Sequence, residues 1–143
     1  MIRKNRCNNR KNHLHGMTLL ELLIAVAIVT ILAMIAYPAM QSYALKAHRT
    51  TALADLSRIQ LALEKGYDGS YLTSASSIMS GSSCTVCESD TARYSLSIVA
   101  SAASYTITAT PSGAQASDAC GGTTYTALTL NQLGLRSPAS CWK

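Results

Sequence analysis

The longest feature of the hydropathy pattern is an almost unbroken apolar stretch from Met17 to Tyr37, interrupted only by Thr18, Glu21 and Thr30. About 20 apolar residues in a helix, rising about 1.5 Å each, match a hydrocarbon core about 30 Å thick. A single segment can satisfy all of its backbone hydrogen bonds in lipid only as a helix. The stretch therefore predicts a membrane-spanning helix over residues 17–38.

Beyond Pro38 the apolar positions become periodic, which predicts an amphipathic continuation of the helix over residues 39–66. They recur at spacings of 7, 4, 3 and 4 on one helix face: Leu45, Ala52, Leu56, Ile59 and Leu63. Pro38 removes one backbone hydrogen bond, so we expect a kink there. Gly66 and Gly69 mark the end of the helix.

Residues 67–143 are expected to form a small globular head built on strands. Residues 66–92 are rich in Ser, Gly and Thr and predict a loop, with one helical turn at Ser76–Met79. Apolar and polar residues alternate over 94–99 and 105–110, and the short link 100–104 predicts a hairpin. Residues 124–130 predict a third strand, with Thr126, Leu128 and Leu130 on one face.

The inward positions of these strands would lie on the Leu56, Ile59 and Leu63 face of the helix, while the tail 134–143 is expected to be irregular. The fold class is therefore α+β: a long N-terminal helix packed on an antiparallel sheet of at least three strands.

Glu21 is the one carboxylate inside the apolar run. A carboxylate at the bilayer centre costs about 2.5–3.5 kcal/mol, so such a residue marks a functional site unless it reaches headgroup water near the end of the run. Residues 1–15 carry five bases and no acid, which predicts that this end stays in the cytoplasm. A cleaved signal peptide is the other interpretation, but the run is too long for a signal core and the small residue Gly16 precedes it.

Together these features resemble the type IV prepilins. The residues that carry the resemblance are Gly16-Met17-Thr18-Leu19-Leu20-Glu21, after a basic leader and before an apolar helix that contains Pro38. The resemblance implies the type IV pilin fold, with residues 1–16 removed by cleavage between Gly16 and Met17. The prepilin peptidase that cleaves the chain would also methylate the new N-terminus, Met17. The family usually has Phe at Met17 and often has Gly at Thr30.

The resemblance also implies a place and a partner for the helix. Glu21 would act in assembly, pairing with the N-terminal amine of the neighbouring pilin subunit, because charges in a dry helix bundle are tolerated only when paired. Before assembly the subunit would cross the inner membrane once, with a cytoplasmic N-terminus and a periplasmic head. After assembly it would belong to an extracellular pilus.

Both ends of the head add to the resemblance. Cys120, residues 128–134 and the ending Cys141-Trp142-Lys143 resemble the C-terminus of PilE-type minor pilins, and residues 67–71 are similar to the turn that follows the pilin helix. The loop with Cys84-x-x-Cys87 is not explained by this resemblance. In the family, the loop after the helix and the disulfide-closed C-terminal loop form edges that meet neighbours or a ligand.

The cysteines predict disulfides in the exported part of the chain. Cys7 would leave with the leader, and the four that remain allow three pairings. We favour Cys84–Cys87 with Cys120–Cys141, whose loop of about 20 residues is worth about 3 kcal/mol in the chain-entropy model. A crossed pairing and a zinc site at Cys84-x-x-Cys87 are the alternatives. No metal or cofactor is expected, since no second close cysteine pair or nearby His accompanies that motif.

The charge balance argues against a nucleic-acid face. The formal net charge is +5, but five of the twelve Lys and Arg lie in the leader, and the remaining seven balance the seven acids. The mature chain is therefore neutral, without the basic stripe typical of DNA-binding domains.

The expected function is that of a structural subunit, a minor pilin needed for pilus assembly, twitching motility or adhesion. A DNA-uptake receptor pilin and a pseudopilin of type II secretion are the alternatives. An enzyme is not expected, because the mature chain has a single His, His48, and its Ser and Thr residues have no evident base.

Overall fold

The computed structural model describes residues 17–81 and 83–143; the predicted leader, with Cys7 and Gly16, lies outside the described residues. The chain divides into two compact units, Met1–Tyr37 and Pro38–Lys143, and each is described by itself. One helix, α1 (Leu19–Lys65), runs through both. The prediction that the helix continues past Pro38 is confirmed, whereas the kink at Pro38 stays a prediction.

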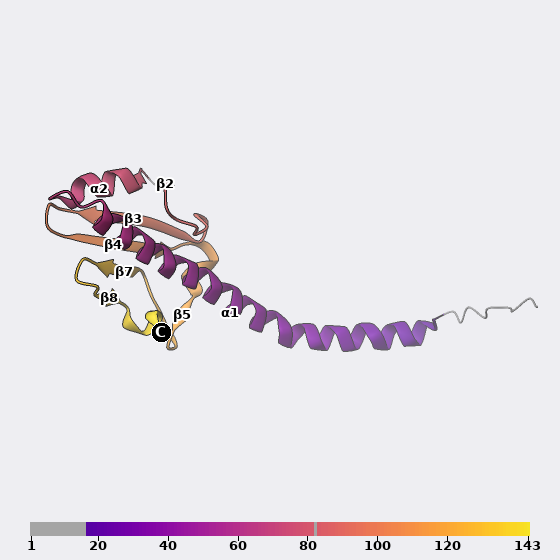
Figure 1. Cartoon of the computed structure of the whole chain (residues 1–143). Coiled ribbons are helices and arrows are strands. Elements are labelled where there is room, and N and C mark those ends of the chain that lie inside the picture. Colours follow the sequence, from indigo (N-terminus) through magenta and orange to yellow (C-terminus); the bar gives the residue numbers. More distant parts are fainter. Residues whose placement is uncertain (1–16, 82) are drawn as a thin grey trace, which may run out of the picture. The chain divides into compact units, whose positions relative to one another are not determined.

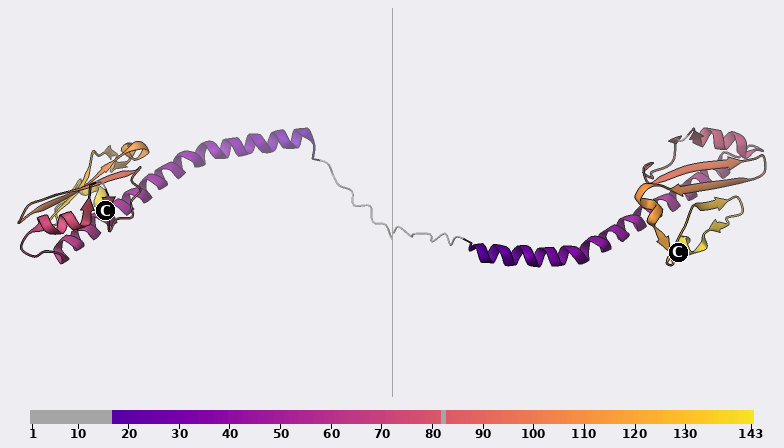
Figure 2. Two further views of the ribbon diagram at one scale, coloured as in Figure 1. Left: turned by 90° about the horizontal axis from the view of Figure 1, so that it is seen from above. Right: turned by 180° about the vertical axis from the view of Figure 1, so that it is seen from behind.

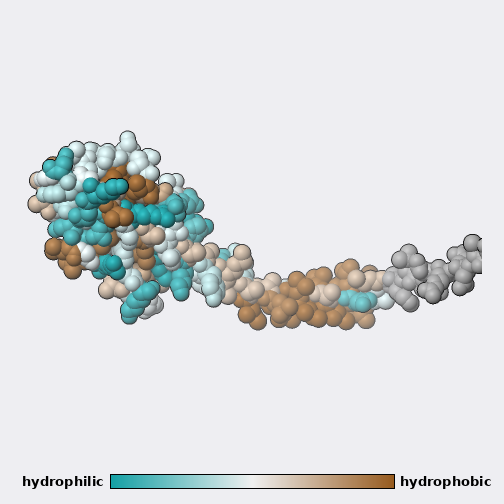
Figure 3. All heavy atoms as spheres, viewed as in Figure 1, coloured by the Kyte–Doolittle hydropathy of each residue, from teal (hydrophilic) through white to brown (hydrophobic). Residues whose placement is uncertain are grey.

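In the first unit, the start of α1 follows from a side-chain cap. The Thr18 Oγ1 atom accepts the Glu21 N–H at 3.2 Å and so satisfies one of the free donors of the first turn. The apolar side chains that follow are exposed, and Figure 3 shows this part of the helix as mostly brown with a teal patch near its start. Within the described residues, α1 is the helix long and apolar enough to cross a membrane.

The second unit packs the remainder of α1 on a four-stranded antiparallel sheet of order β3-β4-β7-β8 (Figure 1). The strands are β3 (Tyr94–Ala100), β4 (Tyr105–Pro111), β7 (Leu128–Asn131) and β8 (Arg136–Ser137). Figure 2 shows α1 lying along one face of this sheet from two further directions. The α+β pilin fold predicted from the sequence is therefore the fold of the chain.

The core lies between the helix and the sheet. The predicted helix face is buried at Ala52, Leu56, Ile59 and Leu63, while Leu45 is only half-buried. The sheet contributes alternate residues, as a strand with one buried face requires. Its fully or nearly fully buried members are Tyr94, Tyr105, Ile107, Ala109, Leu128 and Leu130.

Shorter elements connect the helix to the sheet and the sheet to the chain end. Between α1 and β3 lie α2 (Tyr71–Ile78), β1 (Met79–Ser80) and β2 (Ser83–Cys84). Between β4 and β7 lie the 3-10 helix η1 (Gly113–Ser117) and the hairpin of β5 (Ala119–Cys120) and β6 (Thr123–Thr124). A second 3-10 helix, η2 (Ala139–Trp142), follows β8.

The helical turn predicted at Ser76–Met79 was placed too late and too short. Helix α2 begins at Tyr71 because Ser70 Oγ accepts the Leu72 N–H, and Ser74 Oγ donates to the Gly66 carbonyl at 2.6 Å. These local caps hold a helix that composition alone assigned to a loop.

The C-terminal predictions also need correction. The third strand is limited to four residues, and Thr126, predicted to face inward, is exposed, whereas Tyr125 is buried. The tail is not irregular throughout, since β8 pairs with β7 and η2 follows it. Two-residue strands carry too little alternation to be detected in a sequence.

Candidate functional site

Two disulfides tie the head together, in the pairing favoured from the sequence. Cys84 and Cys87 are joined within one short loop, with Cα atoms 5.5 Å apart. Cys120 of β5 and Cys141 of η2 are joined across 21 residues, with Cα atoms 5.1 Å apart. Because Cys84 and Cys87 bind each other, the zinc interpretation loses its thiolate ligands. The second bridge fixes the chain end to the segment that follows η1.

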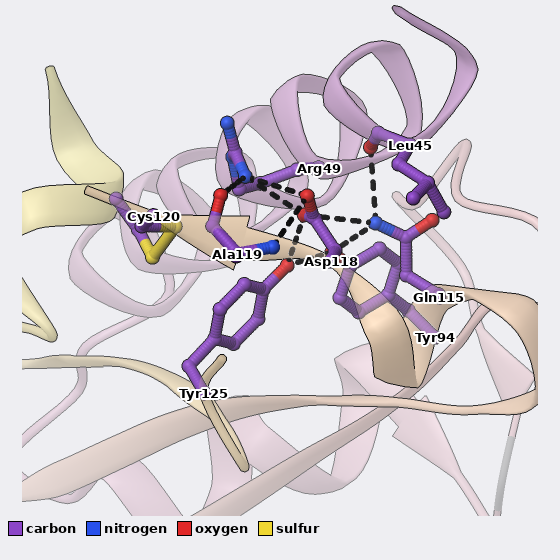
Figure 4. The surroundings of a disulfide bond; sticks show 9 residues. Leu45, Arg49, Tyr94, Gln115, Asp118, Ala119, Cys120 and Tyr125 are labelled. Atoms are coloured by element: carbon purple, nitrogen blue, oxygen red, sulfur yellow. Dashed lines mark hydrogen bonds and ion pairs between the residues drawn. A yellow bond between two sulfur atoms is a disulfide. The ribbon is translucent and has the colours of Figure 1, made fainter. Parts of the chain in front are cut away.

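Beside that bridge lies a buried carboxylate, Asp118, on which several segments converge (Figure 4). Arg49 of α1 donates from Nη1 to both Asp118 oxygens at 2.8 Å and to the Ala119 carbonyl at 3.0 Å. The Tyr125 hydroxyl donates to Asp118 Oδ2 at 2.6 Å. Asp118 is 5% exposed and the Arg49 side chain 14%, so this ion pair is largely withdrawn from water. A buried pair is tolerable because further hydrogen bonds satisfy the carboxylate.

The hydrogen bonds around Asp118 run in one direction. Gln115 Nε2 donates to the Tyr94 hydroxyl at 3.0 Å, and the two tyrosine hydroxyls are 2.6 Å apart. Tyr125 gives its proton to Asp118, so Tyr94 must donate to Tyr125. Gln115 also donates to the Leu45 carbonyl of α1 at 3.0 Å. The result is a chain of donors that ends on one carboxylate and holds α1, β3 and η1 together.

The environment of these tyrosines disfavours their ionised forms. Burial, and then the hydrogen bond to Asp118, raise the pKa of Tyr125. Burial is also the main cause that raises the pKa of Tyr94. Both hydroxyls therefore remain protonated donors throughout the neutral range.

Tyr125 also lines a groove of about 320 Å³ on the head. One wall is the segment 123–127 and the other is the segment 137–140. The side chains that line it are mainly small hydroxyls: Thr123, Thr124, Thr126, Ser137 and Ser140. Both walls belong to the loop that the Cys120–Cys141 bridge closes. Hydroxyl groups of this kind donate to the phosphate and sugar oxygens of nucleic acids.

The wall 123–127 follows a tight hairpin turn. Gly121 and Gly122 connect β5 to β6, and both have positive φ, of 63° and 85°. Two-residue hairpin loops favour this conformation because its twist matches that of the paired strands, and glycine adopts it without steric cost.

A cation lies next to the other wall. The Arg136 guanidinium stacks over the Trp142 ring, 5.0 Å from its centroid. Trp142 Nε1 is buried without a hydrogen-bond partner among the described residues. Arg136 is exposed and directly precedes Ser137 of the groove wall, while Lys143 is exposed at the end of the chain. The stacking on Trp142 limits the freedom of Arg136, whose sequence neighbour Ser137 lines the groove.

The charged residues are unevenly distributed along the chain, which the net charge of zero for residues 17–143 does not show. Among residues 91–143 the acids are limited to Asp118, which Arg49 already neutralises, and the bases are Arg93, Arg136 and Lys143. From residue 119 to residue 143 there is no Asp or Glu at all. The segment that carries the groove is therefore basic, although residues 17–143 as a whole are neutral.

The unexplained cysteine loop is held by a second buried carboxylate. Asp55, on α1 and fully buried, accepts the Glu88 and Ser89 backbone N–H groups at 2.7–3.1 Å as well as the Ser89 hydroxyl. Arg58 donates to it at 3.1 Å and also pairs with Glu88. Sequence reasoning missed this role, although Asp55 lies three residues after Ala52 and four before Ile59, which places an acid on the buried helix face. The contact explains how the loop that contains Cys84 and Cys87 is attached to the helix.

The residues predicted to act in processing and assembly fall in the first unit. Met17 and Glu21 are exposed at the start of the described residues, and Gly16 lies outside them. Thr18 and Glu21 occupy the first and last positions of a T-x-x-E capping pattern, so an acid stands in the first helical turn, where the helix dipole favours negative charge.

Comparisons with known proteins agree with this architecture. The model of the prokaryotic N-terminal methylation motif matches residues 11–37. A second family model, described as type IV minor pilin ComP, DNA uptake sequence receptor, matches residues 38–124. No curated protein and no solved structure matches the chain. Because the second model covers more than half of the 143 residues, the chain belongs to this family of type IV minor pilins.

Proposed function

We propose that this minor pilin is a receptor that binds double-stranded DNA during DNA uptake. The observation that carries the proposal is the match of residues 38–124 to a family described as DNA uptake sequence receptors. The sequence analysis placed a structural role in the pilus first and the DNA-uptake receptor second, because the net charge of the mature chain is zero. The proposal reverses that order. That argument averaged the charge over the chain, whereas binding depends on the surface that meets the phosphates.

The loop closed by Cys120 and Cys141 supports the proposal chemically. Its groove offers five hydroxyl side chains, and Arg136 next to it supplies a positive charge in an acid-free segment. Hydroxyls and bases contact phosphate oxygens and fix the orientation of a duplex, while arginine can also donate to base edges. We assign Arg136 to a direct DNA contact and the hydroxyls to the backbone.

DNA binding can be measured with the mature full-length chain in detergent micelles and a short fluorescent duplex, titrated between about 50 and 200 mM salt. The wild type should bind, and its affinity should fall as salt rises. Arg136→Gln should weaken binding and lower the slope of log affinity against log salt by about one, because one phosphate or base contact is lost. The control is Lys65→Gln, which removes an exposed base at the end of α1.

If the Arg136 and Lys65 variants lost DNA affinity equally, only net charge would matter for binding. The groove would then not be the DNA-binding site. Failure of the wild type to bind any duplex at low salt would contradict the proposed function itself.

The route by which the receptor reaches the filament is part of the same proposal. The leader is cut between Gly16 and Met17, Met17 is methylated, and the subunit waits in the inner membrane with its head outside the cytoplasm. Glu21 then pairs with the N-terminal amine of a neighbouring pilin. The N-methylation motif at residues 11–37 and the exposed apolar half of α1 support this route. Roles in twitching and adhesion stay predictions.

The assembly role of Glu21 can be separated from membrane insertion. Glu21→Gln keeps the size of the side chain but removes the charge that would pair with the amine, so sheared pili should contain several-fold less of the subunit while its membrane level is unchanged. Thr30→Val is the matched control within the same apolar run, because Thr30 already donates to the Val26 carbonyl at 2.8 Å and needs no partner. Immunoblots of pili and membranes give both quantities. Wild-type incorporation of the Gln variant would refute the pairing.

A further inference from the structure

We propose that Asp118 is a positioning residue for the DNA-binding groove, fixing the groove wall at Tyr125 to helix α1 through Arg49. The inference rests on the proposed function, since it concerns how the same groove keeps its shape. Asp118, Tyr94 and Gln115 are between 0% and 5% exposed, so they can affect DNA only through the residues that they hold.

The wall at 123–127 depends on few contacts. Its two-residue strand β6 pairs only with the equally short β5. Among the described residues of segment 121–127, the Tyr125 hydroxyl makes the hydrogen bonds that involve a side chain, to Asp118 and Tyr94. Without that hydroxyl the wall would keep one short strand pair and the packing of the Tyr125 ring. The side-chain hydrogen bonds of the wall therefore all pass through a single atom, the Tyr125 hydroxyl oxygen.

The opposite wall at 137–140 is attached close to the same point. Cys141 follows this wall directly and is joined to Cys120, two residues after Asp118. Asp118 also accepts the N–H of Ala119 at 3.0 Å, and Arg49 donates to the Ala119 carbonyl. Residues 118–120 therefore anchor both walls, one through a carboxylate and the other through a disulfide. Figure 4 shows Cys120 beside the Arg49–Asp118 pair.

Helix α1 gives this anchor its fixed position. Arg49 contacts both oxygens of Asp118, and the Leu45 carbonyl, one helical turn earlier, accepts from Gln115, which also donates to Asp118 at 3.1 Å. Two contacts one turn apart prevent the anchor from sliding along the helix. The spacing between the groove walls is thereby set by a helix that takes no part in the groove.

The chain offers a matched control for this role. Tyr105 is buried like Tyr125, and its hydroxyl likewise donates to a carboxylate at 2.6 Å, that of Glu64 on α1. Tyr105 lies on β4 and does not line the groove. Tyr125→Phe and Tyr105→Phe therefore remove the same kind of bond from two places, and only the first should affect DNA.

The experiment compares these two variants with the wild type, as mature full-length chains in detergent, by the same duplex titration. Tyr125→Phe should bind about fivefold or more weakly, as is typical of coupling between linked sites. Its salt slope should equal that of the wild type, because no phosphate contact is lost. Tyr105→Phe should bind as the wild type does.

If Tyr125→Phe does not fold, the acceptor can be changed instead of the donor. Asp118→Asn replaces the carboxylate that accepts from Tyr125, and its control Glu64→Gln replaces the one that accepts from Tyr105. Equal affinities of the Tyr125 and Tyr105 variants, or of the Asp118 and Glu64 variants, would overturn the inference. A lower salt slope in Tyr125→Phe would also overturn it, because the tyrosine would then contact DNA directly. In each of these cases the wild type still binds, which separates them from failure of the proposed function.

Discussion

At the scale of single residues, the head depends on two carboxylates that the sequence did not mark. Asp55 and Asp118 are both almost fully buried, and each accepts from an arginine of α1. Asp55 also accepts the backbone N–H groups of Glu88 and Ser89, and Asp118 also accepts the Ala119 N–H and the Tyr125 hydroxyl. Helical periodicity places Asp55 on the buried helix face but does not show which groups satisfy its charge. Their role became visible only when residues 33 and 69 positions away were brought to them.

The contribution of a buried carboxylate to the stability of the head can be tested at Asp55. Asp55→Ala should lower the free energy of unfolding by about 1–3 kcal/mol, because two backbone N–H groups lose their buried acceptor, while Arg58 keeps its pair with Glu88. Thermal unfolding followed by circular dichroism would measure the loss. The control Asp68→Ala removes an exposed acid and should leave the midpoint unchanged. Similar midpoints for both variants would mean that Asp55 does not hold the cysteine loop.

At the scale of elements, the sequence was informative wherever a pattern was long. The helix to residue 65 and the hairpin of β3 and β4 were predicted because many residues repeat one period in each. Helix α2 was predicted only as one turn at Ser76–Met79, and the strand β8 and the pairs β1–β2 and β5–β6 were missed. They are set by caps, two-residue ladders and disulfides, which leave little trace in hydropathy.

The stability of the head should also depend on pH, through the buried hydroxyls of Tyr105 and Tyr125. Burial raises the pKa of Tyr105 and Tyr125 above the ordinary value of 10.0, with a further rise from the carboxylates that accept their protons. A raised pKa in the folded state means that the stabilisation is complete below about pH 10 and is lost as the pH rises above it.

Urea unfolding midpoints should therefore be constant from neutral pH to about pH 9 and fall at higher pH. The fall should be smaller in the variant that carries both Tyr105→Phe and Tyr125→Phe, since it has fewer hydroxyls to ionise. An equally steep fall in that variant would assign the pH dependence to other groups.

At the scale of the whole molecule, the sequence motif and the structure give complementary information. The Gly16 to Glu21 motif and the apolar run predicted a pilin, and the family comparison confirmed a type IV minor pilin. The net charge of residues 17–143 is zero whether or not the Arg49–Asp118 pair is counted, so it does not show where the remaining charges lie. Pairing of that acid with Arg49 can be seen only in three dimensions.

The absence of Asp and Glu from residue 119 onward has one more consequence. The acids of the head all lie at or before residue 118, whereas the charged residues after it are the bases Arg136 and Lys143. An approaching polyanion would be turned toward the groove by the electric field before the surfaces touch. Added salt would then mainly slow the association of DNA with the proposed receptor, and it would change the rate of dissociation less.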